Sequence, residues 1–493
     1  METGINLNNS GDIYTLVSFI GYIILILLIG ILSARFSSKG LNEFFLGGRK
    51  MNKFVVALSA VASGRSSWLL IGLTGMAFTI GASALWAFVG YVTAEFLMFL
   101  FAAPRLREQT ERNDNITIPD YFESRHNDSS HLLRILSVLI IIIFMTAYIS
   151  AQFVGGGKAF STSFGVSQTT GVIVTALIVL IYTLLGGFMA VSLTDVVQAI
   201  FMIIALFIVP ILSIIDLGGI ERTIDTIKKV DITLVDPFAL STGALIGFVG
   251  IGFGSPGNPH ILVRYMSIDD PKKLRFSAYM GTFWNAMMGI FAVMIGLVGR
   301  AYFTSSAMLP DGDPENLFPF LAQQHLHPIL FGIVIAAILA AIMSTADSML
   351  LVCASAVIRD IYQKVINPKK EVTEKELVLY SRIIIFILVN IALIFGYIAS
   401  DLVFWLVLFA WGGLGAAFGP PLLLSLFWKR TTRNGVAAGF ISGMLTVIVW
   451  NQIPTLKNVM YELIPAFLIS LLLTIVFSLV NKPKRYEIIR KFR

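Results

Sequence analysis

The chain has 493 residues, of which 56% are hydrophobic and only 13% are charged, and its mean hydropathy is +0.83. A soluble protein of this length carries about a quarter charged residues, so the composition excludes a soluble fold. We expect an all-α polytopic membrane protein with a single domain over 1–493. The net charge of +7 is carried by loops between apolar segments rather than by one basic face, which argues against a nucleic-acid partner.

Apolar stretches of about 20 residues, the length that crosses a lipid bilayer as a helix, recur along the chain. They predict about thirteen transmembrane helices. The predicted ranges are 13–34, 54–79, 82–103, 134–158, 168–190, 195–215, 241–265, 276–300, 328–358, 379–399, 402–428, 435–452 and 460–480.

Basic residues gather in alternate loops between these segments. Threading the helices back and forth puts most of the 36 Lys and Arg on one side, in loops such as Arg35–Lys53, Arg105–Arg134, Arg264–Arg275 and Arg359–Arg382. Cytoplasmic loops carry such an excess of positive charge. We therefore expect a cell-membrane protein with its N-terminus outside and its C-terminus in the cytoplasm.

Two predicted helices contain residues that interrupt a helix. Small and polar residues occupy 62–67 in the second, and glycines and prolines occupy 252–259 in the seventh. Irregular backbone at membrane depth is tolerated where it lines a cavity, although glycines also serve close helix packing. The spacing of the breaks predicts two inverted repeats, 54–215 and 241–428, preceded by a helix at 13–34 and followed by helices within 435–480.

The ninth predicted helix carries the polar run Ser-Thr-Ala-Asp-Ser at 344–348. Lipid cannot solvate a carboxylate, so this run must face the protein interior, and such residues usually mark an ion or substrate path. Hydroxyl and carbonyl oxygens also suit a hard cation stripped of water. Hydrogen bonding of the hydroxyls to their own helix is the alternative.

Several motifs, in order along the chain, resemble the sodium/solute symporter family and are closest to its sodium/proline symporters. They are "FFLGGRKMNKFVVALSAVASGRSSWLLIG", "TIPDYFESR", "LLGGFMAVSLTDVVQA", "GNPHILVRYM", "LAAIMSTADSMLLVCASAVIRDIY" and "WGGLGAAFGPP". The resemblance implies a leucine-transporter-type fold of two five-helix repeats with discontinuous helices 2 and 7. It also implies alternating access driven by a co-transported sodium ion.

The resemblance further implies a sodium site between the second and ninth helices. Its ligands would be the carbonyls of Ala62, Arg65 and Ala341 and the hydroxyls of Ser344 and Thr345. Some members of the family have a second site, whose positions here are Asp195, Ser344, Asp347 and Ser348. The carboxylate at 347, where relatives have a hydroxyl, would strengthen a cation site or carry a proton.

Arg65 departs from the proline-type pattern, which has Asp-Met where this chain has Gly64-Arg65. A guanidinium stays protonated and needs a partner at membrane depth. Glu95 is the first choice because it too is atypical of those relatives, and Asp347 is the second. Contact with a substrate carboxylate, or replacement of the coupling cation by the Arg65 charge, are the alternatives.

The substrate site is expected beside the break in the second helix. The resemblance implicates Trp68, Gly72 and Tyr148, while Ser66 and Ser67 lie next to exposed backbone that suits a carboxylate. In the seventh helix, Ile251 and Ser255 stand where proline-type relatives have aromatic residues, which predicts a larger and more polar pocket.

We expect a sodium-coupled symporter for a small amino acid, with proline as the leading substrate. A symporter for another amino acid or a small carboxylate is the alternative, as is a sodium-independent carrier, proton-coupled or facilitative. An enzyme is not expected, because the five histidines show no metal-ligand spacing and no nucleophile–base motif is present.

Overall fold

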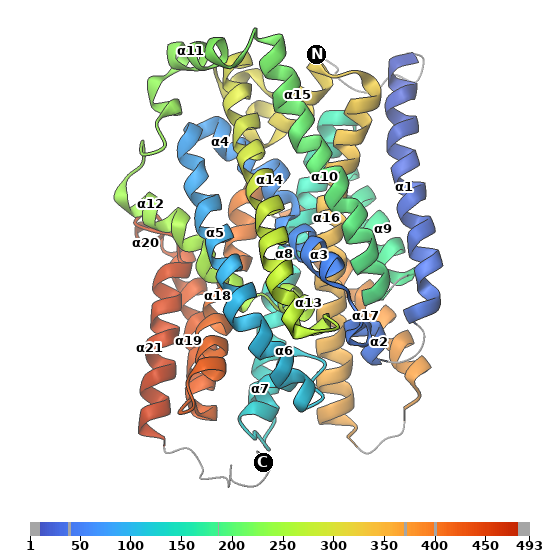
Figure 1. The fold of residues 1–493 in the computed structure, drawn as a ribbon, viewed down its shortest axis with the longest axis vertical. Coiled ribbons are helices and arrows are strands. Elements are labelled where there is room, and N and C mark those ends of the chain that lie inside the picture. Colours follow the sequence, from blue (N-terminus) through green and yellow to red (C-terminus); the bar gives the residue numbers. More distant parts are fainter. Residues whose placement is uncertain (1–9, 38–40, 186, 369–371, 399–401, 482–493) are drawn as a thin grey trace.

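The computed structural model describes residues 10–37, 41–185, 187–368, 372–398 and 402–481. Within these ranges the chain is mostly helical, and the sole β-type pairing is an isolated bridge between Met51 and Ile268. The long helices run side by side along one axis and form a single bundle (Figure 1).

The long helices are α1 (Ser10–Ser37), α8 (Leu132–Phe164), α9 (Gln168–Leu185), α10 (Phe188–Asp216), α14 (Leu274–Tyr302), α16 (Pro328–Ser355), α17 (Glu374–Ile398), α18 (Val403–Phe427), α19 (Arg433–Gln452) and α21 (Leu463–Val480). The shorter ones are α2 (Leu41–Leu46), α3 (Lys53–Ser67), α4 (Thr74–Ile80), α5 (Leu85–Leu97), α6 (Ala103–Arg112), α7 (Ile118–Arg125), α11 (Ile220–Val230), α12 (Thr242–Val249), α13 (Pro259–Ser267), α15 (Leu317–His325) and α20 (Pro454–Lys457).

Each of the thirteen predicted ranges overlaps helical structure. Ten helical stretches of the described chain are long and apolar enough to cross a membrane. The numbers differ because two predicted ranges join in one stretch, Lys53–Arg112, because α9 is short, and because 241–265 is broken. The count of thirteen stays a prediction.

The first break lies at Ser66, inside the predicted interval 62–67. Ser66 has φ 51° and ψ −174°, and the chain resumes in a π-helical turn, Trp68–Leu73, that leads into α4. A positive φ is unusual for a residue with a side chain and tends to occur at functional sites. The break frees backbone N–H groups: that of Ser67 donates to Gln152 Oε1 at 2.9 Å.

The second break separates α12 from α13. Residues Gly250–Gly257 form a 3₁₀ segment and Asn258 is extended, with φ −100° and ψ 100°. Glycine is also needed here for packing, since a Cβ on Gly257 would lie 2.3 Å from the Leu414 carbonyl oxygen of α18. Both interpretations of these glycines therefore hold: they interrupt the helix and they admit a neighbouring helix.

Helix α16 lies in the centre of the bundle and contacts α1, α3, α8 and α10. This position explains why its residues are buried almost throughout. Helix α1 begins at the end of the bundle where α11 lies, and α21 ends at the opposite end (Figure 1). A chain that crosses the membrane an odd number of times begins and ends on opposite sides of it, as α1 and α21 do here.

Candidate functional site: a cation cluster beside an aromatic cavity

The Ser/Thr cluster of α16 meets the broken part of α3. Ser344 Oγ lies 3.2 Å from the Ala62 carbonyl oxygen and 3.1 Å from that of Ala341. Thr345 Oγ1 donates to the Ser63 carbonyl at 3.0 Å. All of these groups are buried. Four of the five residues implied as sodium ligands thus share one site, while the Arg65 carbonyl accepts a backbone hydrogen bond from Trp68.

A buried ion pair between α10 and α13 lies next to Ser348, one turn after Ser344 on α16. Asp195 Oδ2 accepts from Ser59 Oγ at 2.6 Å and from Ser63 Oγ at 3.1 Å, and it pairs with Arg264 Nη2 at 3.0 Å. The same Arg264 nitrogen donates to Ser348 Oγ at 2.5 Å. Ser348 and Asp195 are thus brought together through Arg264, while a second cation site at these residues stays a prediction.

Arg264 was not identified from the sequence, which assigned it to a basic cytoplasmic loop. That assignment is wrong: Arg264 is 1% exposed and lies in the last turn of α13. The signal available was Asp195, since a carboxylate at membrane depth requires a cationic partner. Which arginine would meet it depended on how α13 packs against α3 and α10.

Asp347 adds a second carboxylate to this group. It is fully buried, and its Oδ1 accepts from Ser348 Oγ at 3.1 Å. Asp347 Oδ2 and Asp195 Oδ1 have no hydrogen-bond partner among the described residues. One guanidinium thus faces two carboxylates, which leaves one negative charge to be balanced by a cation or a proton.

Arg65 and Glu95 form a separate pair on the other side of the break. Arg65 Nη2 lies 3.0 Å from Glu95 Oε2, and the guanidinium stacks on Tyr91 with its Cζ 3.6 Å from the ring centroid. Asn285 of α14 also donates to Glu95. This is the first-choice partner expected from the sequence; Asp347 forms no ion pair with Arg65 in the described structure. Because Glu95 neutralises the charge of Arg65, the Arg65 guanidinium is poorly placed to replace a coupling cation.

A small cavity is lined by residues from both broken helices. Its lining residues are Gly64, Trp68, Tyr91, Tyr148, Ile251, Val407, Leu408 and Trp411. The aromatic rings are buried and arranged around Tyr91, whose centroid lies 5.1 Å from that of Trp411 and 6.5 Å from that of Trp68. A mostly apolar lining with a few polar groups is the composition typical of a small-molecule site.

The predicted substrate residues divide into two groups. Trp68, Tyr148 and Ile251 line the cavity, and Ser66 Oγ lies 3.4 Å from the Tyr148 hydroxyl. Ser67 Oγ has no hydrogen-bond partner among the described residues, and the backbone N–H of Ser67 donates to Gln152 of α8. Gly72 packs against Phe404, and Ser255 is buried away from the cavity lining.

The cavity has aromatic walls that were not expected from the sequence, and a pocket larger and more polar than in proline-type relatives stays a prediction. Tyr91 and Trp411, which sequence reasoning did not assign to the site, supply aromatic walls in addition to Trp68 and Tyr148. Trp411 is held in place because its Nε1–H donates to the Ile251 carbonyl at 2.8 Å. A tryptophan beside the glycines of 412–415 was the available signal.

The start of α18, next to the cavity, is held by the buried carboxylate of Glu315. Glu315 accepts from the backbone N–H groups of Val403 and Phe404, each at 2.8 Å, and pairs with Lys158 at 2.6 Å. Phe404 in turn stacks on Trp68, with ring centroids 5.7 Å apart. Burial raises the pKa of Glu315, and the Lys158 ammonium opposes that rise. The loop carrying Glu315 therefore fixes the start of α18 over the cavity wall.

Broken helices, a buried cluster of oxygen atoms suited to a cation and a small cavity lined by both breaks are features of a membrane transporter that couples a solute to a cation. The chain belongs to the sodium:solute symporter family, whose model matches residues 44–443. It is accordingly a multi-pass protein of the plasma membrane.

Two curated relatives cover nearly the whole chain. The sodium/proline symporter of Escherichia coli (strain K12) is 40% identical over 482 residues, which are 97% of this chain and 95% of the relative. The osmoregulated proline transporter OpuE of Bacillus subtilis (strain 168) is 40% identical over 464 residues, 94% of each chain.

Solved structures establish the fold. A Na⁺-coupled sialic acid symporter, in a substrate-bound outward-open state, superposes with a TM-score of 0.80 at 18% identity over 95% of this chain and 98% of the other. MhsT in complex with L-phenylalanine gives 0.52 at 15% identity, covering 86% and 98%. The predicted leucine-transporter-type architecture is confirmed by these matches.

Proposed function

We propose that this protein is a sodium-coupled symporter that imports proline by alternating access. The relatives named above, 40% identical over nearly all of their length, are a sodium/proline symporter and a proline transporter. The lining of the cavity supports this substrate, because Trp68, Tyr91 and Trp411 supply apolar faces of the kind against which a small saturated ring packs.

The observation that carries the proposal is the oxygen cluster between α3 and α16. Hydroxyls of Ser344 and Thr345 lie beside the Ala62 and Ala341 carbonyls with no charged group in direct contact. Neutral oxygens suit a monovalent cation, whose hydration shell they replace. Since the cluster joins the broken helix to α16, a bound sodium ion would stabilise one packing of these helices.

A second cation is proposed between Asp195 and Asp347. Each carboxylate has an oxygen without a hydrogen-bond partner among the described residues, and the Ser348 hydroxyl lies nearby, in contact with Asp347 and with the Ser344 carbonyl. Two carboxylates and one guanidinium leave a single negative charge. One sodium ion, or one proton on Asp347, would balance it.

We propose the membrane arrangement predicted from the sequence. Each break lies in the first helix of one of the two repeats, 54–215 and 241–428. One helix at 13–34 precedes the repeats, and two helices within 435–480 follow them. The N-terminus is placed outside and the C-terminus in the cytoplasm, so that Glu315 closes the external side.

Uptake into proteoliposomes tests the function. We expect radiolabelled proline to accumulate with an inward sodium gradient and not in choline buffer. Changing both Ser344 and Thr345 to Ala should raise the sodium concentration for half-maximal uptake at least tenfold, about 1.4 kcal/mol. Ser137→Ala is the matched control, because that buried hydroxyl only donates to its own helix, at 2.7 Å to the Leu133 carbonyl.

The same assay separates the alternatives. Sodium-dependent uptake of another amino acid or a small carboxylate, without proline uptake, would replace the substrate and keep the coupling. Equal uptake in sodium and choline would overturn sodium coupling and favour a proton-coupled or facilitative carrier.

A further inference from the structure

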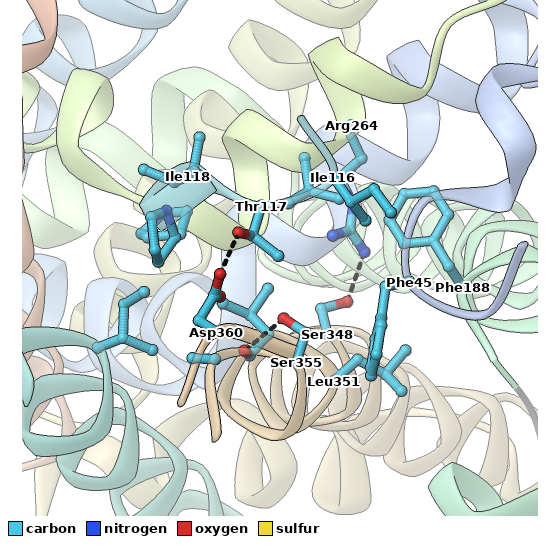
Figure 2. Close-up of a pocket in the computed structure, with 16 residues that line it drawn as sticks. Phe45, Ile116, Thr117, Ile118, Phe188, Arg264, Ser348, Leu351, Ser355 and Asp360 are labelled. Carbon is cyan, nitrogen blue, oxygen red and sulfur yellow. Dashed lines mark hydrogen bonds between the residues drawn. The ribbon is translucent and has the colours of Figure 1, made fainter. Parts of the chain in front are cut away.

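A second cavity lies beside Ser348 and Arg264 and shares no lining residue with the aromatic cavity. Its wall includes Arg264 and Ser348 at one end and Thr117 and Asp360 at the other, with Ser355 between them (Figure 2). Ser348 and Ser355 are seven residues apart on α16, two helical turns or about 10 Å on the same face. The wall of this cavity therefore runs from Ser348 towards the predicted cytoplasmic end of this helix.

Asp360 is the chemically notable residue of this cavity. It is fully buried in the π-helical segment Ala356–Ile366 that follows α16. Its Oδ1 accepts from Thr117 Oγ1 at 2.9 Å and from Arg134 Nη1. Its Oδ2 has no hydrogen-bond partner among the described residues. A buried carboxylate oxygen without a hydrogen-bond donor costs free energy unless a cation binds to it.

The charges around Asp360 leave it short of one positive charge. Arg134 is shared between Asp360, Asp120 at 2.8 Å and Glu123 at 2.7 Å, and Arg359 lies 3.5 Å from Asp120. The guanidinium groups of Arg134 and Arg359 thus pair with three carboxylates, those of Asp120, Glu123 and Asp360. The one further titratable partner in this group of described residues is His131, which lies 3.0 Å from Glu123 and adds a charge only when protonated.

We propose that Asp360, with Thr117 and Ser355, forms a further monovalent-cation site through which sodium leaves the main cluster for the cytoplasm. The inference rests on the proposed sodium coupling and orientation. A cation leaving Ser348 needs oxygen ligands at each step, and sites that bind weakly in series allow it to move on. Ser355 and Asp360 supply those oxygens along one wall. Arg134 holds Asp360 while the cavity is closed and competes with the departing ion.

The test compares sodium effects on the two sides of right-side-out membrane vesicles. Internal sodium inhibits uptake by binding again from the cytoplasm. Asp360→Asn should raise the internal sodium concentration for half-inhibition at least fivefold, while the external concentration for half-maximal uptake changes less than twofold. Proline exchange at equal sodium on both sides should persist, since exchange needs no net sodium release.

Glu123→Gln is the matched control, because Glu123 contacts the same Arg134 but does not line the cavity. It should leave both constants within twofold. Equal shifts of the internal constant in Asp360→Asn and Glu123→Gln, or equal internal and external shifts in Asp360→Asn, would overturn the site.

A milder variant covers the case in which Asp360→Asn does not fold. Ser355→Ala removes only a hydroxyl that donates to the Val352 carbonyl at 2.8 Å, and it should still shift the internal constant about twofold or more. No shift would overturn the proposal. If the unaltered protein shows no dependence on external sodium, the proposed coupling has failed, which is a different result.

Discussion

Arg65 and Glu95 form an ion pair with no solvent exposure of the guanidinium, 3.0 Å between Nη2 and Oε2, at the break in α3. Two nitrogens of Arg65, Nε and Nη1, have no hydrogen-bond partner among the described residues, and the Tyr91 ring covers the group instead. The pair therefore links α3 to α5 beside the aromatic cavity. Its charges depend on each other because neither reaches water.

Glu95→Ala should accordingly be more damaging than the double change of Arg65 and Glu95 to Ala. The single change leaves a buried guanidinium unpaired, at a cost of about 3–5 kcal/mol, whereas the double change removes both charges. Thermal unfolding of the purified variants measures this difference. Asp269→Ala is the control, since Asp269 pairs with Lys273 where both side chains are exposed, and a surface pair of this kind contributes little to stability. A double variant less stable than Glu95→Ala would contradict the coupling.

Asp347→Asn should reduce the number of coupled cations by one. The change keeps the shape of the side chain and removes the charge that a second cation would balance. For a tenfold sodium gradient without a membrane potential, proline accumulation should fall from about 100-fold with two cations to about tenfold with one. If Asp347 carries a proton instead, the loss should appear with a pH gradient. An unchanged accumulation ratio under both gradients would rule out either role.

Ile251 and Ser255 should differ in their effect on selectivity. Ile251 lines the aromatic cavity and Ser255 does not. Ile251→Ala removes apolar contact with the substrate, and such a loss changes kcat/KM about tenfold or more. We expect a loss for proline and a relative gain for larger amino acids in competition assays. Ser255→Ala should stay within about threefold, and an equal effect of both changes would be inconsistent with this cavity as the substrate site.

Asp120 makes a pH-dependent contribution to stability on the predicted cytoplasmic side. Burial acts to raise the pKa of Asp120, but the Arg359 and Arg134 guanidinium groups hold it below the ordinary carboxyl value. A carboxyl with a lowered pKa in the folded state stabilises that state above its unfolded pKa, about 3.9, and loses this effect as the pH falls through the folded value.

Asp120→Asn should therefore lower Tm at pH 7 and pH 5, and the deficit relative to the unaltered protein should shrink below about pH 4. Differential scanning fluorimetry of both proteins measures it. Glu108→Gln, at an exposed position of α6, should show no such pH-dependent deficit. A deficit of constant size down to the lowest pH would show that the Asp120 charge is not responsible.

The sequence by itself was sufficient for the features set by local composition. Lipid admits only backbone that is hydrogen-bonded internally, so apolar runs located the helices and the Gly/Pro interval at 252–259 located a break. The polar run at 344–348 had to face inwards for the same reason, and it lies at the contact with Ala62. Even Arg65 and Glu95 were paired correctly, because a mid-membrane charge restricts its possible partners.

Only the tertiary structure decided which distant residues share a site. Asp195 and Arg264 are 69 residues apart, and Tyr91 and Trp411 lie on α5 and α18. No local pattern specifies such neighbours, since they depend on the angle and register at which whole helices pack. The aromatic walls of the cavity were therefore missed, and Arg264 was assigned to a loop. A side chain near a helix end faces solvent or the core according to what packs against that last turn.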